Sequence, residues 1–239
     1  MSQHAQLTKL AALLVAVLGT AVQPSAQPVS DVEITADGLH RIDPAVMPNA
    51  WINTESDITQ YARAFVMPTV VMYRDLRPPS HSSWADMNRS AFPLSEHMQK
   101  RLQESFGESF HEMMDGQRVF EVADALGRDV VLVRGYLTDV ATGMPLDLAG
   151  SDVDVVRWAW EANLIIELRD SMTDDVLFRA ADRQRIEGPL DPDTLFGLAP
   201  QVTRRWSRIM VDRLQELSTF YPSRLYRLQE RARAAEDLD

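Results

Sequence analysis

The segment from Asp154 to Asp182 constrains the fold more than any other part of the chain, because its apolar side chains recur at every second position. One face of an extended strand would carry Trp158, Trp160, Ala162, Leu164, Ile166 and Leu168. The other face would carry Glu161, Asn163, Glu167 and Arg169. Since successive side chains of a strand point to opposite faces, the pattern predicts an antiparallel strand with one buried face and one face in water.

A second strand returns along the first. The polar stretch from Ser171 to Asp175 predicts a turn, and the residues after it alternate again. Val176, Phe178 and Ala180 would form the apolar face of this returning strand. The segment is therefore expected to form a β-hairpin.

Three further strands are expected. The run from Ala64 to Tyr73 is apolar on both faces and contains Pro68, which predicts a covered strand with a break at the proline. Residues Arg118 to Ala123 and Asp129 to Val140 are predicted as two strands joined through Leu126 and Gly127. The second of these is rich in β-branched residues, which favour extended backbone.

Two helices complete the expected elements. The first runs from Ser95, whose hydroxyl can cap it, to about Asp115, and the second from about Ala199 to Leu217, with Pro222 beyond its end. The first helix has the buried stripe Met98, Leu102, Phe106, Phe110 and Met113. The second has the stripe Val202, Trp206, Ile209, Met210, Leu214 and Leu217.

This order of elements predicts an α+β fold of two layers. A mostly antiparallel sheet of about five strands would have two helices packed on one face, which leaves Glu161, Glu167 and Arg169 in water. The domain is expected to span residues 61–218. Residues 27–60 are expected to be a polar linker or arm, and residues 219–239 a charged C-terminal helical tail.

The first 26 residues have the three-part pattern of a secretory signal peptide. Lys9 precedes the apolar run Leu10 to Leu18, which is about half the ~20 residues that a membrane-spanning helix needs. Small residues before Ala21 and before Ala26 allow cleavage after either, and Ala26 is the preferred boundary. We therefore expect a periplasmic protein without a transmembrane segment after cleavage; the alternative is an uncleaved membrane anchor.

Composition excludes several chemistries. The chain has no cysteine, which rules out disulfides, thiolate metal sites, thiol nucleophiles and a lipid-bearing cysteine. Its net charge is −11. Nucleic acids and anionic membrane surfaces require a basic face, so neither is an expected partner.

Three stretches resemble the exported bacterial domain-of-unknown-function family 3313, whose members are lipoprotein-like. They are VLVRGYLTDV at residues 131–140, ANLIIELRDSMTDDVLFRAADRQ at residues 162–184, and RRWSRIMVDRL at residues 204–214. The resemblance spans roughly residues 61–217 and implies an envelope protein without established catalytic residues. Two departures are the missing lipid-bearing cysteine and the turn at Asp174 and Asp175, where such turns usually hold glycine.

The sharpest catalytic candidate is the run from His111 to Asp115, His-Glu-Met-Met-Asp. It is similar to the zinc-protease pattern, in which two ligands four residues apart share a helix face and a glutamate activates water. Asp115 would be the second ligand, and His97 could be a third. The competing interpretation is a polar helix end with an exposed His111.

Other combinations favour ordinary structure over chemistry. His81, Ser82 and Ser83 follow a proline-rich loop without the constrained turn that nucleophilic serines need. The acidic pairs Asp152/Asp154, Asp174/Asp175 and Asp191/Asp193 lack the ligand spacing of calcium loops. Trp158 and Trp160 could line a groove, but core positions are the preferred interpretation.

The sequence thus predicts a non-enzymatic binding or assembly accessory protein of the bacterial cell envelope. Its partner would be an unknown envelope protein or a small ligand; no cofactor, catalytic residue or metal ligand is assigned. One alternative is a metal-dependent hydrolase that uses His97, His111 and Asp115. Another is a structural protein that self-associates through Leu225 and Leu228 of the tail.

Overall fold

The computed structural model describes residues 33–42, 44, 47–76, 91–143, 156–190 and 197–220. The predicted signal peptide, the tail with Leu225 and Leu228, and the loop with His81, Ser82 and Ser83 lie outside these residues. So do the acidic pairs Asp152/Asp154 and Asp191/Asp193.

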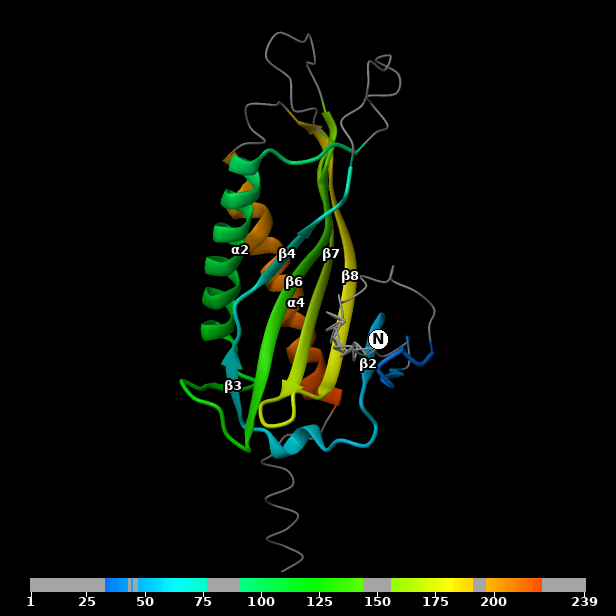
Figure 1. Ribbon diagram of the computed structural model, residues 1–239, viewed down its shortest axis with the longest axis vertical. Helices are drawn as coiled ribbons and strands as arrows, with labels where there is room; N and C mark the ends of the chain where they lie inside the picture. Colours follow the sequence, from blue (N-terminus) through cyan, green and yellow to red (C-terminus); the bar gives the residue numbers. More distant parts are fainter. Residues whose placement is uncertain are drawn as a thin grey trace, which may run out of the picture.

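The centre of the sheet consists of three long antiparallel strands (Figure 1). They are β6 (Val130–Thr142), β7 (Val156–Asp170) and β8 (Val176–Leu190). Ile166 of β7 lies between Gly135 of β6 and Ala180 of β8. The predicted hairpin is β7 and β8, joined by a turn in which Asp174 adopts the left-handed φ of 63°. Aspartate tolerates this conformation better than most residues, which explains the turn without glycine.

Short strands extend the sheet on both sides. The strand β2 (Ala50–Ile52) pairs with β8, and β1 (His40–Arg41) pairs with β2, both antiparallel. At the other edge, β3 (Arg63–Val66) and β4 (Val70–Tyr73) run parallel to β6, and β5 (Glu121–Val122) runs parallel to β3. A 3₁₀ turn, η1, covers Ile58–Gln60.

The protein has the expected α+β character, but the prediction of a five-stranded, mostly antiparallel sheet is wrong. The described residues form a mixed sheet of eight strands, in the order β1-β2-β8-β7-β6-β3-β5, with β4 paired to β6. Pro68 divides the apolar run into β3 and β4, and both pair with β6 in parallel. The strands β1 and β2 come from residues 27–60, which were expected to be a linker or arm; strands this short leave no periodicity in a sequence.

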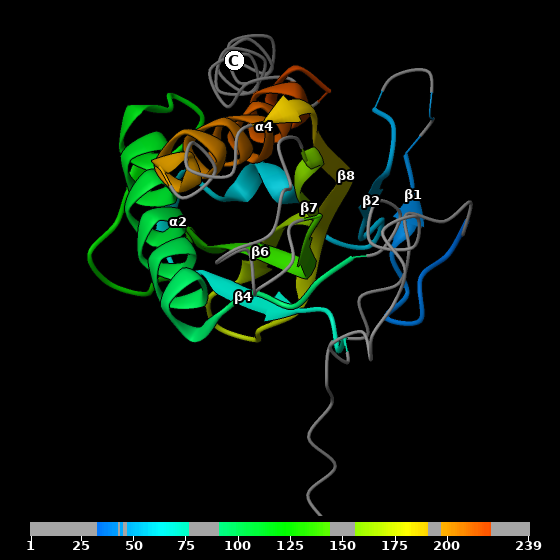
Figure 2. The same cartoon turned by 90° about the horizontal axis from the view of Figure 1, so that it is seen from above.

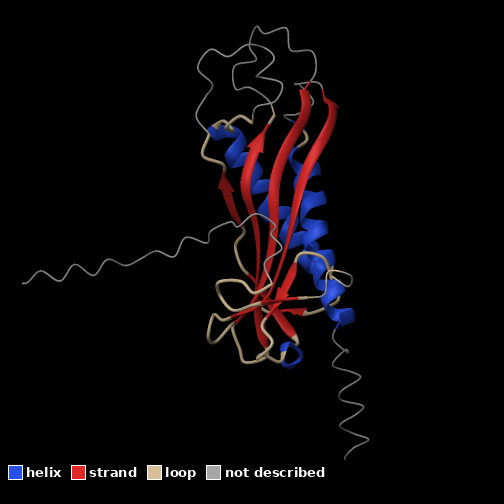
Figure 3. Cartoon of the chain, turned by 90° about the vertical axis from the view of Figure 1, so that its right-hand side faces the viewer, coloured by secondary structure: helices blue, strands red, loops and turns tan. Residues whose placement is uncertain are grey.

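Two helices, α2 (Glu96–Gly116) and α4 (Ala199–Phe220), cover one face of the sheet and pack against each other (Figures 2 and 3). The backbone N–H of Met98 donates to the Ser95 hydroxyl at 3.4 Å, as the capping prediction requires. The buried stripe of α2 continues to Met114 at steps of four residues, while Met113 is only partly buried. None of the described helices is long and apolar enough to cross a membrane.

The core lies between these helices and the inner face of β6, β7 and β8. Phe106, Phe110, Trp160 and Trp206 are among its largest members and are all at most 1% exposed. Trp160 is thus a core residue, as predicted. Removing this apolar surface from water is the main favourable contribution to folding.

The prediction that Trp158 and Trp160 share one face is wrong. The register of β7 against β8 shifts between them, and consecutive Ala159 and Trp160 both join the core. A bulge inserts one extra residue and so reverses the alternation beyond it. Trp158 instead lies beneath the guanidinium of Arg185, 5.0 Å from the ring centre, and against Gly143.

At Gly135 of β6, the helix α2 packs closely against the sheet. A Cβ at this position would lie 2.8 Å from the ring of Phe110, which is fully buried. We expect Gly135→Ala to lower the free energy of unfolding by about 1–3 kcal/mol, because the ring has no room to retreat. Urea denaturation measures the change. Gly116→Ala, whose Cβ would meet nothing within 4 Å, is the matched control, and an equal loss there would contradict this explanation.

Candidate functional site

The outer face of the sheet, opposite α2 and α4, carries the polar side chains of β6, β7 and β8. Strand register places these side chains in rows of three. Arg134, Glu167 and Arg179 form one row, and Tyr136, Ile165 and Ala181 the next. The third row consists of Thr138, Asn163 and Arg183, followed by Glu161 beside Arg185. The face thus has a carboxylate row at each end and two uncharged positions on β7 between them.

Glu161 is the centre of the first charged group. Its side chain is 1% exposed and accepts hydrogen bonds from three arginines. Arg74 donates at 2.8 Å, Arg185 Nε donates at 2.5 Å, and Arg183 Nη2 also donates. Burial alone would raise the pKa of Glu161, but these three donors lower it to about 2.

Glu167 is the centre of the second charged group and is 5% exposed. It accepts from Arg179 at 2.6 Å, and from Arg169 and the Tyr136 hydroxyl at 3.1 Å. Arg179 also contacts Asp37, which lies before β1. Burial and the neighbouring Glu167 charge raise the pKa of Tyr136, so this hydroxyl stays protonated.

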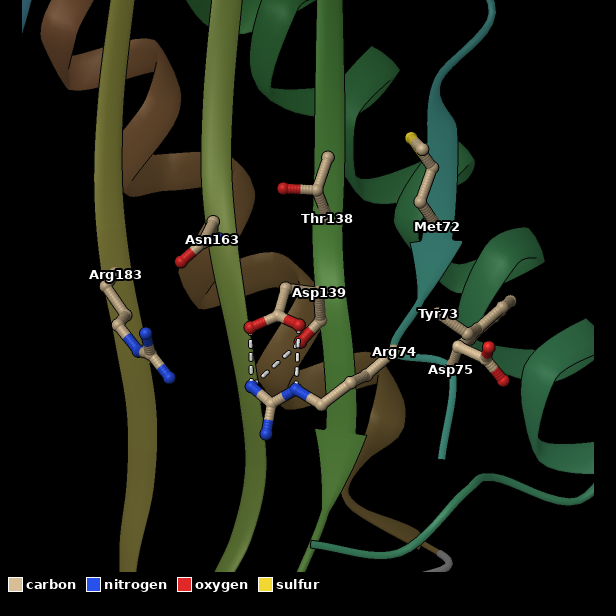
Figure 4. A pocket seen from close by; sticks show the side chains of 8 residues that line it. All are labelled: Met72, Tyr73, Arg74, Asp75, Thr138, Asp139, Asn163 and Arg183. Carbon is tan, nitrogen blue, oxygen red and sulfur yellow. Dashed lines mark hydrogen bonds and ion pairs between the residues drawn. The ribbon is translucent and has the colours of Figure 1, made fainter. Parts of the chain in front are cut away.

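A pocket of about 340 Å³ opens on this face beside the Glu161 group (Figure 4). Its lining comes from β4, β6, β7 and β8 and from Arg74 and Asp75, which follow β4. The lining residues are Met72, Tyr73, Arg74, Asp75, Thr138, Asp139, Asn163 and Arg183. Figure 4 shows Thr138, Asn163 and Arg183 on the side of the sheet away from the helices, whereas Tyr73 reaches toward α2, where its hydroxyl donates to the Gln99 carbonyl at 2.8 Å.

Thr138 and Asn163 line this pocket with buried atoms that lack partners. They are 3% and 4% exposed, and among the described residues neither Thr138 Oγ1 nor Asn163 Oδ1 has a hydrogen-bond partner. An unpaired buried polar group costs about 1–3 kcal/mol. A group that donates hydrogen bonds to these two atoms would remove that cost.

Asp139 shows a second irregularity at the pocket. Its φ is 56°, and the register of β6 against β7 shifts between Thr138 and Ala141. Arg74 holds the Asp139 carboxylate through its Nε at 2.7 Å and its Nη2 at 2.5 Å. Non-glycine residues with positive φ concentrate at functional sites, because the surrounding contacts must stabilise them.

The predicted exposure of the outer face is partly wrong. Glu161 and Glu167 were expected in water but are buried, whereas Arg169 is about a quarter exposed. Glu167 forms a cross-strand ion pair with Arg179 of β8. Arginines at alternate positions of β8, residues 179, 183 and 185, were the sequence signal for these charged groups.

The structure does not bring His97, His111 and Asp115 together as a metal site. All three are exposed on α2, and Glu112 pairs with Arg204 of α4 at 2.9 Å. Fourteen residues of helix separate His97 from His111, a rise of about 21 Å. Within the described ranges, no group of three or more histidine, aspartate and glutamate side chains could hold a metal ion. The sequence reasoning missed Thr138 and Asn163, which are polar residues on predicted strands with no distinguishing local pattern.

Comparisons with known proteins leave the family open. No family model and no curated protein matches the chain, so the resemblance to family 3313 stays a prediction. A Helicobacter pylori homolog of the neuraminyllactose-binding hemagglutinin is 8% identical, with a TM-score of 0.37, and the match covers 76% of this chain and 94% of that one. A Xanthomonas campestris protein of family DUF330 is 12% identical, with a TM-score of 0.37 and coverages of 66% and 87%.

A PelC dodecamer from Paraburkholderia phytofirmans is 8% identical, with a TM-score of 0.28 and coverages of 66% and 95%. These likenesses are partial, and none of them places a ligand or a partner on this chain.

The Glu161 group is expected to contribute to stability in a pH-dependent way. Glu161→Gln removes the carboxylate that three arginines share, so we expect a loss of about 2–3 kcal/mol in the free energy of unfolding at pH 7. The folded-state pKa lies below the ordinary value of 4.5, so the contribution is present above pH 4.5 and is lost as the pH falls toward 2. Denaturation of both proteins between pH 7 and pH 2.5 should show their difference shrinking below pH 4.5.

Glu112→Gln is the control, because the Glu112–Arg204 pair is more than half exposed. Exposed pairs contribute little, so this variant should stay within about 0.5 kcal/mol of the wild type at every pH. A pH-independent difference for Glu161→Gln would refute the role of its ionisation.

Proposed function

We propose that this chain is an exported, non-enzymatic binding or assembly accessory protein of the bacterial cell envelope, which works through the pocket on the outer face of its sheet. The observation that carries the proposal is the pair of buried, unpartnered polar atoms on Thr138 and Asn163 at that pocket. Binding sites combine a concave surface with a few placed polar groups, and a ligand that pairs with these atoms removes their cost.

The ionisation of the site favours binding over catalysis. A general acid or base works best with a pKa near the operating pH. Glu161 has a pKa of about 2, and Arg74, whose pKa is raised by Asp139, stays charged. These groups hold fixed charges at neutral pH and transfer no proton. The alternative of a hydrolase built on His97, His111 and Asp115 has no comparable support, because His97 lies about 21 Å along α2 from His111 and all three side chains are exposed.

The proposed location rests on the amino-terminal pattern of residues 1–26 and on the resemblance to family 3313. We expect the full chain, expressed in a Gram-negative host, to be recovered from the periplasmic fraction. Sequencing of its amino terminus should show cleavage after Ala21 or Ala26. Recovery from the cytoplasm with an intact Met1 to Ala26 segment would contradict the proposal.

The role of the pocket is testable in the same cells. Cross-linking in intact cells should join the wild-type protein to an envelope component, and Asn163→Leu should abolish that product because it removes a polar atom from the pocket. Gln103→Ala, exposed on α2 on the opposite side of the sheet, should leave the product unchanged. A product that survives Asn163→Leu would place the interaction elsewhere on the molecule.

A further inference from the structure

If the pocket is the binding site, as proposed above, the chemistry of its lining indicates which class of ligand it binds. Thr138, Asn163 and Arg183 lie in one row across β6, β7 and β8, and all three line the pocket. Neighbouring strands are about 4.8 Å apart, so the row presents three polar groups to a single small molecule. Figure 4 shows the three side chains on the open side of the sheet.

The unpartnered atoms require a ligand that donates hydrogen bonds. Asn163 Oδ1 can only accept, and the Thr138 hydroxyl can accept or donate. Ionised carboxylates and phosphates only accept, so they could satisfy the threonine but not the asparagine oxygen. Hydroxyl, amide and ammonium groups can donate to both atoms.

The charges around the pocket favour an uncharged ligand. Its lining contains two positively charged residues, Arg74 and Arg183, and two negatively charged residues, Asp75 and Asp139, so the formal charges sum to zero. Arg74 is bound to Asp139 and Glu161, and Arg183 donates through Nη2 to Glu161. An ammonium group would lie beside Arg183, and an anion would have to compete with Glu161. Neither sign of charge has a net attraction to this site.

The surrounding backbone favours hydroxyl groups over a peptide. Extended peptides bind through the free edge of a sheet. Here β7 is paired with β6 on one side and β8 on the other, so the row at Asn163 offers no edge. A volume of about 340 Å³ is at the small end for ligand sites, which suits one or two sugar rings. Met72 of β4 adds an apolar wall for the C–H surface of such a ring.

We infer that the pocket binds an uncharged carbohydrate, with sugar hydroxyls that donate to Asn163 Oδ1 and Thr138 Oγ1. The same hydroxyls can accept from the guanidinium of Arg183. A hydroxyl both donates and accepts, so a single sugar can satisfy the whole row.

The test is titration calorimetry of the purified mature protein with four probes. Maltose and di-N-acetylchitobiose are the neutral sugars, galacturonic acid is the acidic sugar, and triglycine is the peptide. We expect at least one neutral sugar to bind and the other two classes not to bind. Thr138→Val and Asn163→Leu should each weaken that affinity about tenfold or more, and Gln103→Ala should not change it.

The melting temperature of Thr138→Val distinguishes a ligand-binding role of this hydroxyl from a purely structural one. The substitution replaces a buried hydroxyl that has no partner with a methyl group of similar shape, so the free protein should melt a few degrees higher while sugar binding weakens. A lower melting temperature would mean that the hydroxyl stabilises the fold and is not reserved for a ligand.

The inference is overturned if neither neutral sugar binds, if galacturonic acid or triglycine binds in their place, or if Thr138→Val leaves the affinity unchanged. These failures differ from a failure of the proposed function. An exported protein that loses its cross-linked product in Asn163→Leu but binds neither neutral sugar would have a binding pocket for another ligand class. A protein retained in the cytoplasm, or cross-linked independently of Asn163, would contradict the function itself.

Discussion

The burial of β7 on both faces is the constraint on which the rest of the structure depends. Its edges are paired with β6 and β8, and its inner face is covered by α2 and α4. On its outer face, Glu161 and Glu167 are largely withdrawn from water because arginine side chains pack against them. An isolated buried carboxylate is too costly to remain charged, so each one requires cationic partners close by. Arg74, which follows β4, and the arginines of β7 and β8 meet that requirement.

These charged groups also join parts of the chain that are distant in sequence. Arg74 brings β4 to the Glu161 group at the outer face of β7, and Arg179 connects Glu167 to Asp37 before β1. The short strands at the two edges of the sheet have few backbone hydrogen bonds of their own. Ion pairs with the central strands help to hold these short strands in place. Because Arg74 lines the pocket, its ion pairs also position one wall of the pocket.

The pocket lies beside the Glu161 group, where the charged Arg74, Asp139 and Arg183 adjoin the uncharged Thr138 and Asn163. Seven buried side-chain atoms of the described residues lack a hydrogen-bond partner, and those of Thr138 and Asn163 are the two that belong to the pocket lining. The left-handed backbone at Asp139 stands next to them. A ligand site provides one reason for both features, since local strain and unpaired polar groups are tolerated where binding compensates for them.

The sequence by itself determined the hairpin of β7 and β8, the two amphipathic helices and the cap at Ser95, because each follows from periodicity or side-chain chemistry within a few residues. Only the tertiary structure decided the parallel pairing of β3 and β4 with β6, since strand partners are chosen by contacts far apart in the chain. It also decided the bulge that turns Trp158 away from the core. The candidate site belongs to this second class: Thr138, Asn163 and Arg183 become neighbours only when three strands take their register.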